Sequence, residues 1–211
     1  MSTRAVFCDA LGTLVELEPP WVHLGPALGI NPKDERLVAA VRAEMAYYKA
    51  HAHEGADPES LGHLRRRCAG VLSSELGQTV DAATLLGAIR FRPYPDALPA
   101  LTGLRDGGLT LVCVSNWDVS LPDVLARCGL DGELDGVVSS AAAGARKPDP
   151  AIFTPALELA GCTPEEALHV GDTPEEDAEA ARAAGIPWLL VDRDGGGDIA
   201  SLTEIDQHLR P

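Results

Sequence analysis

Aromatic residues and long apolar runs are scarce in this 211-residue sequence, and Phe, Trp and Tyr together make up only 4% of it. No apolar stretch approaches the roughly 18 residues that a membrane-spanning helix needs, and no N-terminal run is typical of a signal peptide. The remaining composition, 45% apolar and 23% charged, is that of a globular chain. We therefore expect a soluble, cytoplasmic protein that does not act at a membrane.

Positive charge is also in short supply. The chain has 17 Lys and Arg against 32 Asp and Glu, a net charge of −15. Binding a nucleic-acid backbone requires concentrated Lys and Arg, so this balance argues against a nucleic-acid partner. A small anionic substrate stays compatible with the sequence, because a few local cations and a metal ion can override the overall charge.

The cysteines show no metal-site or disulfide pattern. They are odd in number and have no CxxC spacing: Cys8, Cys68, Cys113, Cys128 and Cys162. Neither a zinc site nor a disulfide framework is indicated, which fits a reducing compartment.

Five short apolar runs predict buried strands: Ala5–Cys8, Leu109–Val114, Gly136–Val138, Ala167–Val170 and Trp188–Val191. Helix-like segments, each followed by a glycine, lie between the later runs: Leu121–Cys128, Pro150–Ala160 and Glu175–Ala184. Strands that alternate with helices predict an α/β fold with a parallel sheet, whose strands are apolar throughout because both faces are covered.

Residues 16–91 break this alternation. Apolar residues at helical spacing predict helices at Asp34–His53 and Pro58–Leu76, and a weaker one at Ala82–Ile89. No strand is apparent there. The simplest interpretation is a helical insertion between the first and second strands of the sheet.

Polar side chains follow four successive predicted strands. In chain order they are Asp9, Ser115 with Asn116, Lys147, and Asp172 with Asp177. Each alone has an ordinary explanation, such as a helix cap, a turn or a solvated cation. Ligands of open α/β sheets bind outside the carboxyl ends of the strands, so four clusters in register indicate one functional site.

These motifs resemble those of the haloacid dehalogenase superfamily of aspartate-nucleophile hydrolases, subfamily I type with a helical cap. The four motifs read Asp9-Ala10-Leu11-Gly12-Thr13, Ser115 in LVCVSNWD, Lys147 in RKPDPAIF, and Gly171-Asp172 through Asp177. The resemblance covers Val6 to about Val191, with the insertion matched by position only. It implies a Rossmann-like core of residues 1–15 and 92–211, with a mobile helical cap of residues 16–91.

The resemblance also implies a role for each motif residue in a Mg²⁺-dependent phosphatase. Asp9 would be the nucleophile, and the Mg²⁺ ligands would be Asp9, the Leu11 carbonyl, Asp172 and Asp177. Catalysis would use Asp9, Thr13, Ser115 and Lys147. The phosphoryl group of a small metabolite would be bound by Gly12, Thr13, Ser115, Asn116 and Lys147.

Leu11 departs from the pattern of the family's phosphatases, which carry a second aspartate there as the general acid and base. Leucine cannot transfer a proton, and general acid–base catalysis is worth roughly 10²–10⁴-fold in rate. A phosphohydrolase would therefore be restricted to good leaving groups or would take a donor from the cap, near Tyr47–His51.

Three alternatives stay open. A 2-haloacid dehalogenase needs no proton for its leaving halide, although family members with that activity dispense with the metal and this chain keeps Asp172 and Asp177. A phosphonoacetaldehyde hydrolase would use a cap lysine as a Schiff base; Lys49 would need burial beside its tyrosine neighbours to favour the neutral amine. The third is a non-catalytic protein that binds a phosphometabolite. The sequence is compatible with a monomer or a homodimer, since apolar cap faces can pack on the core or on another subunit.

Overall fold

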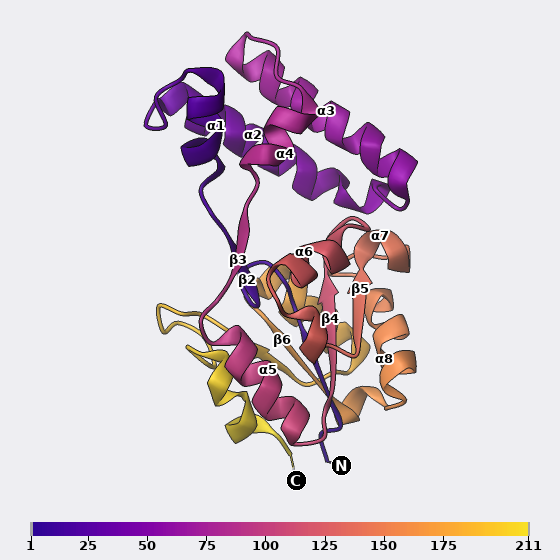
Figure 1. The fold of residues 1–211 in the computed structure, drawn as a ribbon. Helices are drawn as coiled ribbons and strands as arrows, with labels where there is room; N and C mark the ends of the chain where they lie inside the picture. Colours follow the sequence, from indigo (N-terminus) through magenta and orange to yellow (C-terminus); the bar gives the residue numbers. More distant parts are fainter. Residues whose placement is uncertain (1, 211) are drawn as a thin grey trace.

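Five parallel strands form the sheet at the centre of the larger part of the molecule (Figure 1). The structure is a computed structural model, and it describes residues 2–210. The strands are β1 (Ala5–Cys8), β4 (Thr110–Ser115), β5 (Gly136–Ser139), β6 (Ala167–Gly171) and β7 (Trp188–Leu190), in the spatial order β5-β4-β1-β6-β7. The predicted α/β class and all five predicted strands are confirmed. Because β1 lies between β4 and β6, the residues that follow these three strands are neighbours.

Side chains of β1 alternate between two apolar layers, as a strand buried on both faces requires. Val6 and Cys8 belong to one cluster, and Ala5 and Phe7 to the other. The first cluster is covered by α5 (Ala97–Asp106), α6 (Leu121–Arg127) and η6 (Leu202–His208), and the second by η3 (Pro150–Phe153), α8 (Thr154–Ala160) and α9 (Glu179–Ala184). Short turns complete the core: η2 (Asp131–Glu133), α7 (Ser140–Ala143), η4 (Pro164–Glu166) and the π-helical η5 (Pro174–Ala178).

The second part of the molecule is a helical group with its own apolar core (Figure 1). Its elements are α1 (Pro20–Leu28), α2 (Glu35–His51), η1 (Ala52–Glu54), α3 (Pro58–Leu76) and α4 (Ala82–Ala88). The start of α3 is fixed by a capping box, in which Asp57 accepts from the Ser60 amide and the Ser60 hydroxyl accepts from the Asp57 amide. Leu64 and Leu72 of α3 are wholly buried in this core.

An antiparallel ribbon joins the two parts. It pairs β2 (Val15–Leu17) with β3 (Phe91–Pro93), so the expectation of no strand in residues 16–91 is wrong at both ends of that segment. Three residues each are too few to show a period-2 pattern. The boundaries of the core and the cap predicted from the sequence stay a prediction, and the ribbon lies where the chain crosses them. Within residues 2–210, no helix combines the length and the apolar character needed to cross a bilayer.

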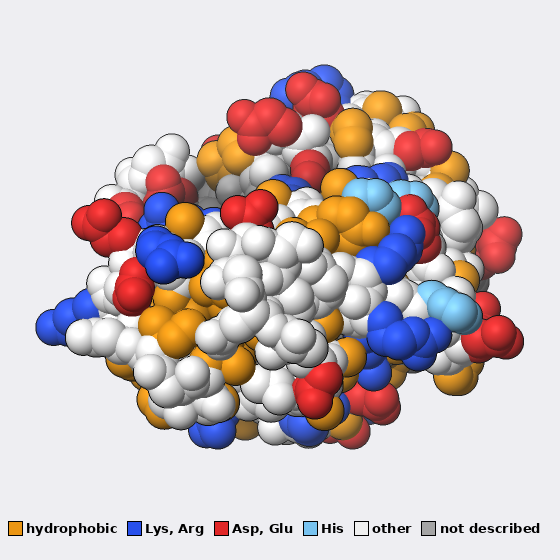
Figure 2. All heavy atoms as spheres, turned by 90° about the horizontal axis from the view of Figure 1, so that it is seen from above, with side chains coloured by type: hydrophobic (Ala, Val, Ile, Leu, Met, Phe, Trp, Pro, Cys, Tyr) orange, Lys and Arg blue, Asp and Glu red, His pale blue; other side chains and the backbone are white. Residues whose placement is uncertain are grey.

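The C-terminal end of α2 contacts the core near the carboxyl ends of the strands. The Tyr48 hydroxyl donates to Asp118 Oδ2 at 2.8 Å, and the Lys49 ammonium lies 3.1 Å from Glu176 Oε1. Seen from above, acidic and basic side chains are interspersed over the face in view (Figure 2). Among the arginines of α3, Arg67 forms an ion pair with Glu54.

Candidate functional site

Lys147 is the centre of the polar cluster at the carboxyl ends of β1, β4 and β6. Its side chain is 2% exposed, and its ammonium donates to Asp9 Oδ1 at 2.5 Å, to Asp177 Oδ1 at 2.5 Å and to the Val114 carbonyl at 3.1 Å. All three N–H donors of the lysine are therefore used. Burial lowers the pKa of Lys147, but the two carboxylates outweigh it and leave the pKa above its ordinary value.

Asp177 is held by more partners than Lys147 alone. Its Oδ1 also lies 2.9 Å from His169 Nε2, and its Oδ2 accepts from the Thr173 amide at 3.0 Å. Burial raises the pKa of Asp177, whereas Lys147 and His169 together lower it well below its ordinary value. Gly171 is required next to it, because a Cβ there would lie 2.2 Å from Asp177 Cγ. The partners of Asp177 thus favour its ionised form beside Lys147.

Asp9 is 6% exposed, and its pKa is shifted in the opposite direction from that of Asp177. Burial raises its pKa to about 6; Lys147 opposes this shift, while the charges of Asp177 and Asp172 add to it. Only Oδ1 of Asp9 has a hydrogen-bond donor within residues 2–210, namely Lys147. The second oxygen, Oδ2, therefore remains available to a ligand.

Asp172 completes a group of three carboxylates. Oxygen atoms of Asp9, Asp172 and Asp177 lie within 4.8 Å of one another. Burial and the charge of Asp177 raise the pKa of Asp172. Gly12, with φ +89°, passes so close that a Cβ would lie 2.0 Å from Asp172 Oδ2, so only glycine fits there. One lysine does not neutralise three carboxylates, and hard oxygen ligands at this spacing suit a divalent cation such as Mg²⁺.

Ser115 and Asn116, both predicted to bind a phosphoryl group, differ in their contacts within the protein. Ser115 ends β4 and is 3% exposed. The Asn116 amide group is bound to the Lys147 backbone, accepting from its N–H at 2.8 Å and donating to its carbonyl at 3.0 Å. Asn116 therefore positions Lys147 in this structure, and its direct contact with a phosphoryl group stays a prediction.

The loop after Asp9 also differs in part from the predicted cradle. The Gly12 amide donates to the Val15 carbonyl at 2.9 Å, which uses the N–H that was expected to face a phosphoryl oxygen. Thr13 is wholly buried, and its hydroxyl has no hydrogen-bond partner within residues 2–210. In this conformation, therefore, the Gly12 amide is not presented to a ligand, and the predicted contact of the Thr13 backbone amide with a phosphoryl oxygen stays a prediction.

Leu11 points away from the core, with 40% of its surface exposed. A side chain at this position is therefore accessible from solvent. The structure thus places an apolar, solvent-accessible side chain two residues after Asp9.

Two of the residues proposed as substitute donors contact the core through their side chains. Tyr48 donates to Asp118, and Lys49 is 61% exposed and paired with Glu176. The Schiff-base hypothesis relied on burial of Lys49 beside its tyrosine neighbours, and this premise is wrong, because most of the Lys49 side chain is exposed to solvent.

Glu176 and His169 also contact residues of the site, although neither was among the site residues predicted from the sequence. Glu176 accepts from Asn116 Nδ2 at 3.1 Å and pairs with Lys49 of the cap. His169 is wholly buried and lies between the Phe7 carbonyl and Asp177. The sequence positions of Glu176 and His169 relative to Asp172 do not indicate these contacts, because the partners of both side chains lie on other helices and strands.

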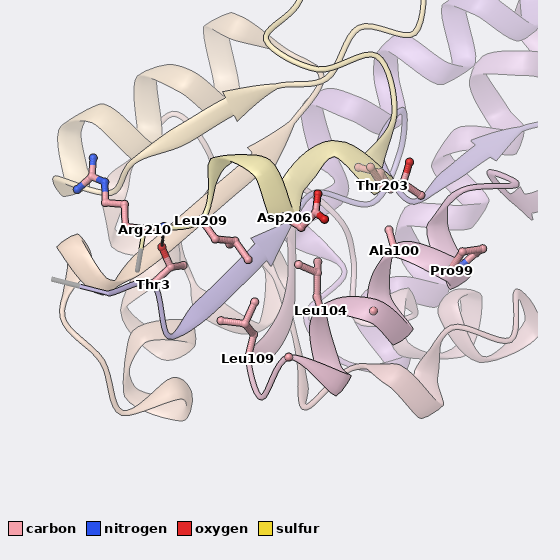
Figure 3. Close-up of a pocket in the computed structure, with 12 residues that line it drawn as sticks. Thr3, Pro99, Ala100, Leu104, Leu109, Thr203, Asp206, Leu209 and Arg210 are labelled. Carbon is pink, nitrogen blue, oxygen red and sulfur yellow. Dashed lines mark hydrogen bonds between the residues drawn. The ribbon is translucent and has the colours of Figure 1, made fainter.

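A separate hollow of about 380 Å³ lies away from this cluster, between α5 and the C-terminal segment (Figure 3). Leu104, Leu109 and Leu209 line it together with Asp206 and Arg210. None of the carboxylates around Lys147 contributes to it, and among residues 2–210 Asp206 is the one carboxylate in its lining. The candidate chemistry therefore stays with the cluster at the strand ends.

Comparison with known proteins gives the same family at several levels. A model of the haloacid dehalogenase-like hydrolase family matches residues 3–185. Haloacid dehalogenase-like hydrolase domain-containing protein 3 from Bos taurus is 46% identical over 91 residues, covering 43% of this chain and 36% of that protein. Phosphoserine phosphatase from Thermus thermophilus is 35% identical over 142 residues, covering 63% of this chain and 56% of the phosphatase.

The chain thus matches only about a third to a little over half of the length of these curated relatives. Among solved structures, the L-2-haloacid dehalogenase from Xanthobacter autotrophicus superposes with a TM-score of 0.73 at 23% identity, covering 97% of both chains. At that identity the similarity shows the fold alone.

Proposed function

The chain belongs to the haloacid dehalogenase-like hydrolases, and from this premise we propose that it is a Mg²⁺-dependent phosphohydrolase that acts on a small phosphorylated metabolite through an aspartyl-phosphate at Asp9. The observation that carries the proposal is the buried Lys147, which joins Asp9 to Asp177 beside Asp172. Relatives named phosphoserine phosphatase and phosphoglycolate phosphatase support the reaction class.

Asp9 Oδ2, the oxygen without a protein donor, would attack the phosphorus atom while the bond from phosphorus to the leaving oxygen breaks. Water would then attack the phosphorus of the aspartyl-phosphate, releasing phosphate and returning the Asp9 carboxylate. Lys147 keeps Asp9 oriented and reduces its repulsion from Asp172 and Asp177 in both steps.

Magnesium would be held by Asp9 and Asp172, with Asp177 and the Leu11 carbonyl as the further ligands predicted from the sequence. Bound there, the ion would supply positive charge against the repulsion between the nucleophile and the phosphate. Of the three carboxylates, Asp177 has the most protein partners, so Asp9 and Asp172 would carry most of the metal affinity.

The metal assignment predicts the effect of one substitution. Asp172→Ala should weaken Mg²⁺ binding by more than about tenfold, because it removes a carboxylate that is less committed to protein partners than Asp177 and so is freer to bind the ion. Isothermal titration with MgCl₂ measures this directly, with Asp131→Ala on the exposed surface as the matched control. Equal Mg²⁺ affinity in wild type and Asp172→Ala would remove Asp172 from the metal site.

Leu11 sets the leaving-group preference. Without a proton donor the first step favours a weakly basic leaving group, and without a base the hydrolysis of the aspartyl-phosphate is slow. Leu11→Asp should raise steady-state turnover of an alkyl phosphate such as glycerol phosphate by roughly 10²-fold, and that of p-nitrophenyl phosphate by less.

The matched control for this prediction is Leu11→Asn, which has the polarity and size of aspartate but no carboxyl proton to transfer. It should stay at the wild-type rate. A rise of the same size in Leu11→Asn would show that polarity, and not proton transfer, limits turnover.

The proposal as a whole is tested by Mg²⁺-dependent release of p-nitrophenol from p-nitrophenyl phosphate. Wild type should release it with Mg²⁺ and not with EDTA. The second candidate is dehalogenation, favoured by Leu11, since a departing halide needs no proton. Halide release from a 2-haloacid that is insensitive to EDTA, without phosphatase activity, would favour this candidate.

A further inference from the structure

Arg193 belongs to a part of the chain that the family match does not cover. The match ends at residue 185, and Arg193 follows β7 in the loop that leads to the C-terminal η6. This C-terminal segment lies beside α5 (Figure 1). From there the Arg193 side chain reaches back to the loop that carries Asp9.

The Arg193 guanidinium makes three contacts at once. Its Nη2 donates to the Thr13 carbonyl at 2.9 Å, and its Nη1 donates to Asp96 Oδ2 at 2.7 Å. Its central carbon lies 3.7 Å from the centroid of the Tyr94 ring. A planar guanidinium with several fixed donors suits such a combination, and an ammonium does not.

The same partners hold the next residue of the loop. The Tyr94 amide donates to the Leu14 carbonyl at 3.0 Å, so Arg193 and Tyr94 together bind two successive carbonyls, those of Thr13 and Leu14. Asp96 in turn accepts from the Leu202 amide at 2.9 Å, which anchors the C-terminal segment to the same point. The nucleophile loop and the C-terminal segment therefore share one network.

This network is incomplete in its hydrogen bonding. Within residues 2–210, three buried side-chain atoms have no partner, and all three belong to it: Thr13 Oγ1, Asp96 Oδ1 and Arg193 Nε. An unsatisfied buried polar atom costs free energy, so a cluster that served stability alone would be expected to satisfy them. Such defects concentrate at functional sites, where geometry is constrained by something other than stability.

We propose that Arg193 is a positioning residue, which fixes the backbone at Thr13 and thereby aims the Asp9 carboxylate at the phosphorus atom. The inference rests on the proposed phosphohydrolase function. Arg193 itself does not touch the reacting atoms; it acts through the loop of residues 9–14. A misplacement of about 1 Å in a reacting group can cost roughly 10²-fold in rate.

The test compares wild type with Arg193→Gln, and with Arg182→Gln as the matched control. Arg182 also lies over an aromatic ring, that of Trp188, but on α9 and without contact to the nucleophile loop. With p-nitrophenyl phosphate, Arg193→Gln should lower kcat by about 10–100-fold with little change in KM. The groups that bind the substrate stay in place, whereas the Asp9 carboxylate is no longer held in the orientation needed to attack phosphorus. Arg182→Gln should keep the wild-type kcat.

Amide hydrogen exchange gives a readout that does not depend on turnover. In Arg193→Gln, exchange should accelerate about tenfold in the peptide containing Leu14 and Val15, whose amides both donate to the Ala10 carbonyl. Peptides from α3 should exchange as in wild type. Arg193→Lys keeps the positive charge but loses the planar pair of N–H donors, so it should behave like Arg193→Gln. If the glutamine variant does not fold, the lysine variant is measured instead.

If Arg193 only stabilised the C-terminal segment, the results would differ. Faster exchange confined to residues 192–208, with wild-type kcat and wild-type exchange at Leu14 and Val15, would overturn the inference. If wild type itself shows no phosphatase activity, the proposed function fails, and the exchange of the loop peptide still decides whether Arg193 positions it.

Discussion

Lys147→Met is expected to lower the free energy of unfolding by about 3–5 kcal/mol, because it leaves Asp9 and Asp177 as buried carboxylates without their shared cation. For a chain of this length the melting temperature should fall by roughly 6–20 °C. Thermal unfolding followed by circular dichroism, without divalent metal, measures the loss. Phosphatase activity should disappear as well.

The loss should depend on pH with a definite sign. Burial already raises the pKa of Asp9 to about 6, and removing Lys147 raises it further. A carboxyl whose pKa is raised on folding favours the folded state at low pH, and this contribution is lost as pH rises through the folded-state pKa. Lys147→Met should therefore lose more stability near pH 8 than near pH 5.

The matched control is Lys33→Met, an exposed lysine, which should melt like wild type. In the double variant Lys147→Met/Asp177→Asn, part of the loss should be recovered because one buried charge is gone. A melting temperature for Lys147→Met equal to that of Lys33→Met would show that the buried cation does not hold the site together.

Asp9→Asn should abolish turnover while leaving the fold intact. The amide is isosteric with the carboxylate but is not a nucleophile towards phosphorus, so kcat for p-nitrophenyl phosphate should fall by roughly 10⁴-fold or more. Because the pKa of Asp9 is raised on folding, its ionised form opposes folding above about pH 6. The variant should thus be at least as stable as wild type near pH 8.

Asp206→Asn, at the separate hollow, is the control for Asp9→Asn and should retain full turnover. Residual turnover in Asp9→Asn within tenfold of wild type would contradict a nucleophilic role for Asp9. Loss of activity together with loss of the folded state would leave stability as the cause, and the melting measurement separates the two.

The five strands of the parallel sheet could be predicted because each is a continuous apolar run, whereas the three-residue strands β2 and β3 could not. The helices α1 and α5 could not. Pro20, Gly25 and Pro26 interrupt the pattern of α1, which forms because Leu24 is buried in the cap core. The start of α5 is hidden among prolines in the same way. In both cases tertiary packing outweighs local propensity.

The grouping of the site residues could be predicted in part. Asp9 and Asp172 follow strands that the α/β pattern already makes neighbours, and the structure brings both together with Lys147. No sequence pattern indicated the role of Arg193, because it donates to the carbonyl of Thr13, a residue 180 positions away in the sequence. Local patterns identify strand ends, but they do not indicate which distant side chain returns to hold a loop.

The most direct measurement is to stop the wild-type reaction with acid during p-nitrophenyl phosphate turnover in Mg²⁺ and to locate the phosphoryl group by peptide mass spectrometry. With Leu11 in place of a base, hydrolysis of the intermediate is slow, so it should accumulate after a burst of p-nitrophenol. The predicted result is one added phosphoryl group on Asp9, absent in Asp9→Asn. Turnover with no modified Asp9 peptide, or with the phosphoryl group on another residue, would contradict an aspartyl-phosphate mechanism at this site.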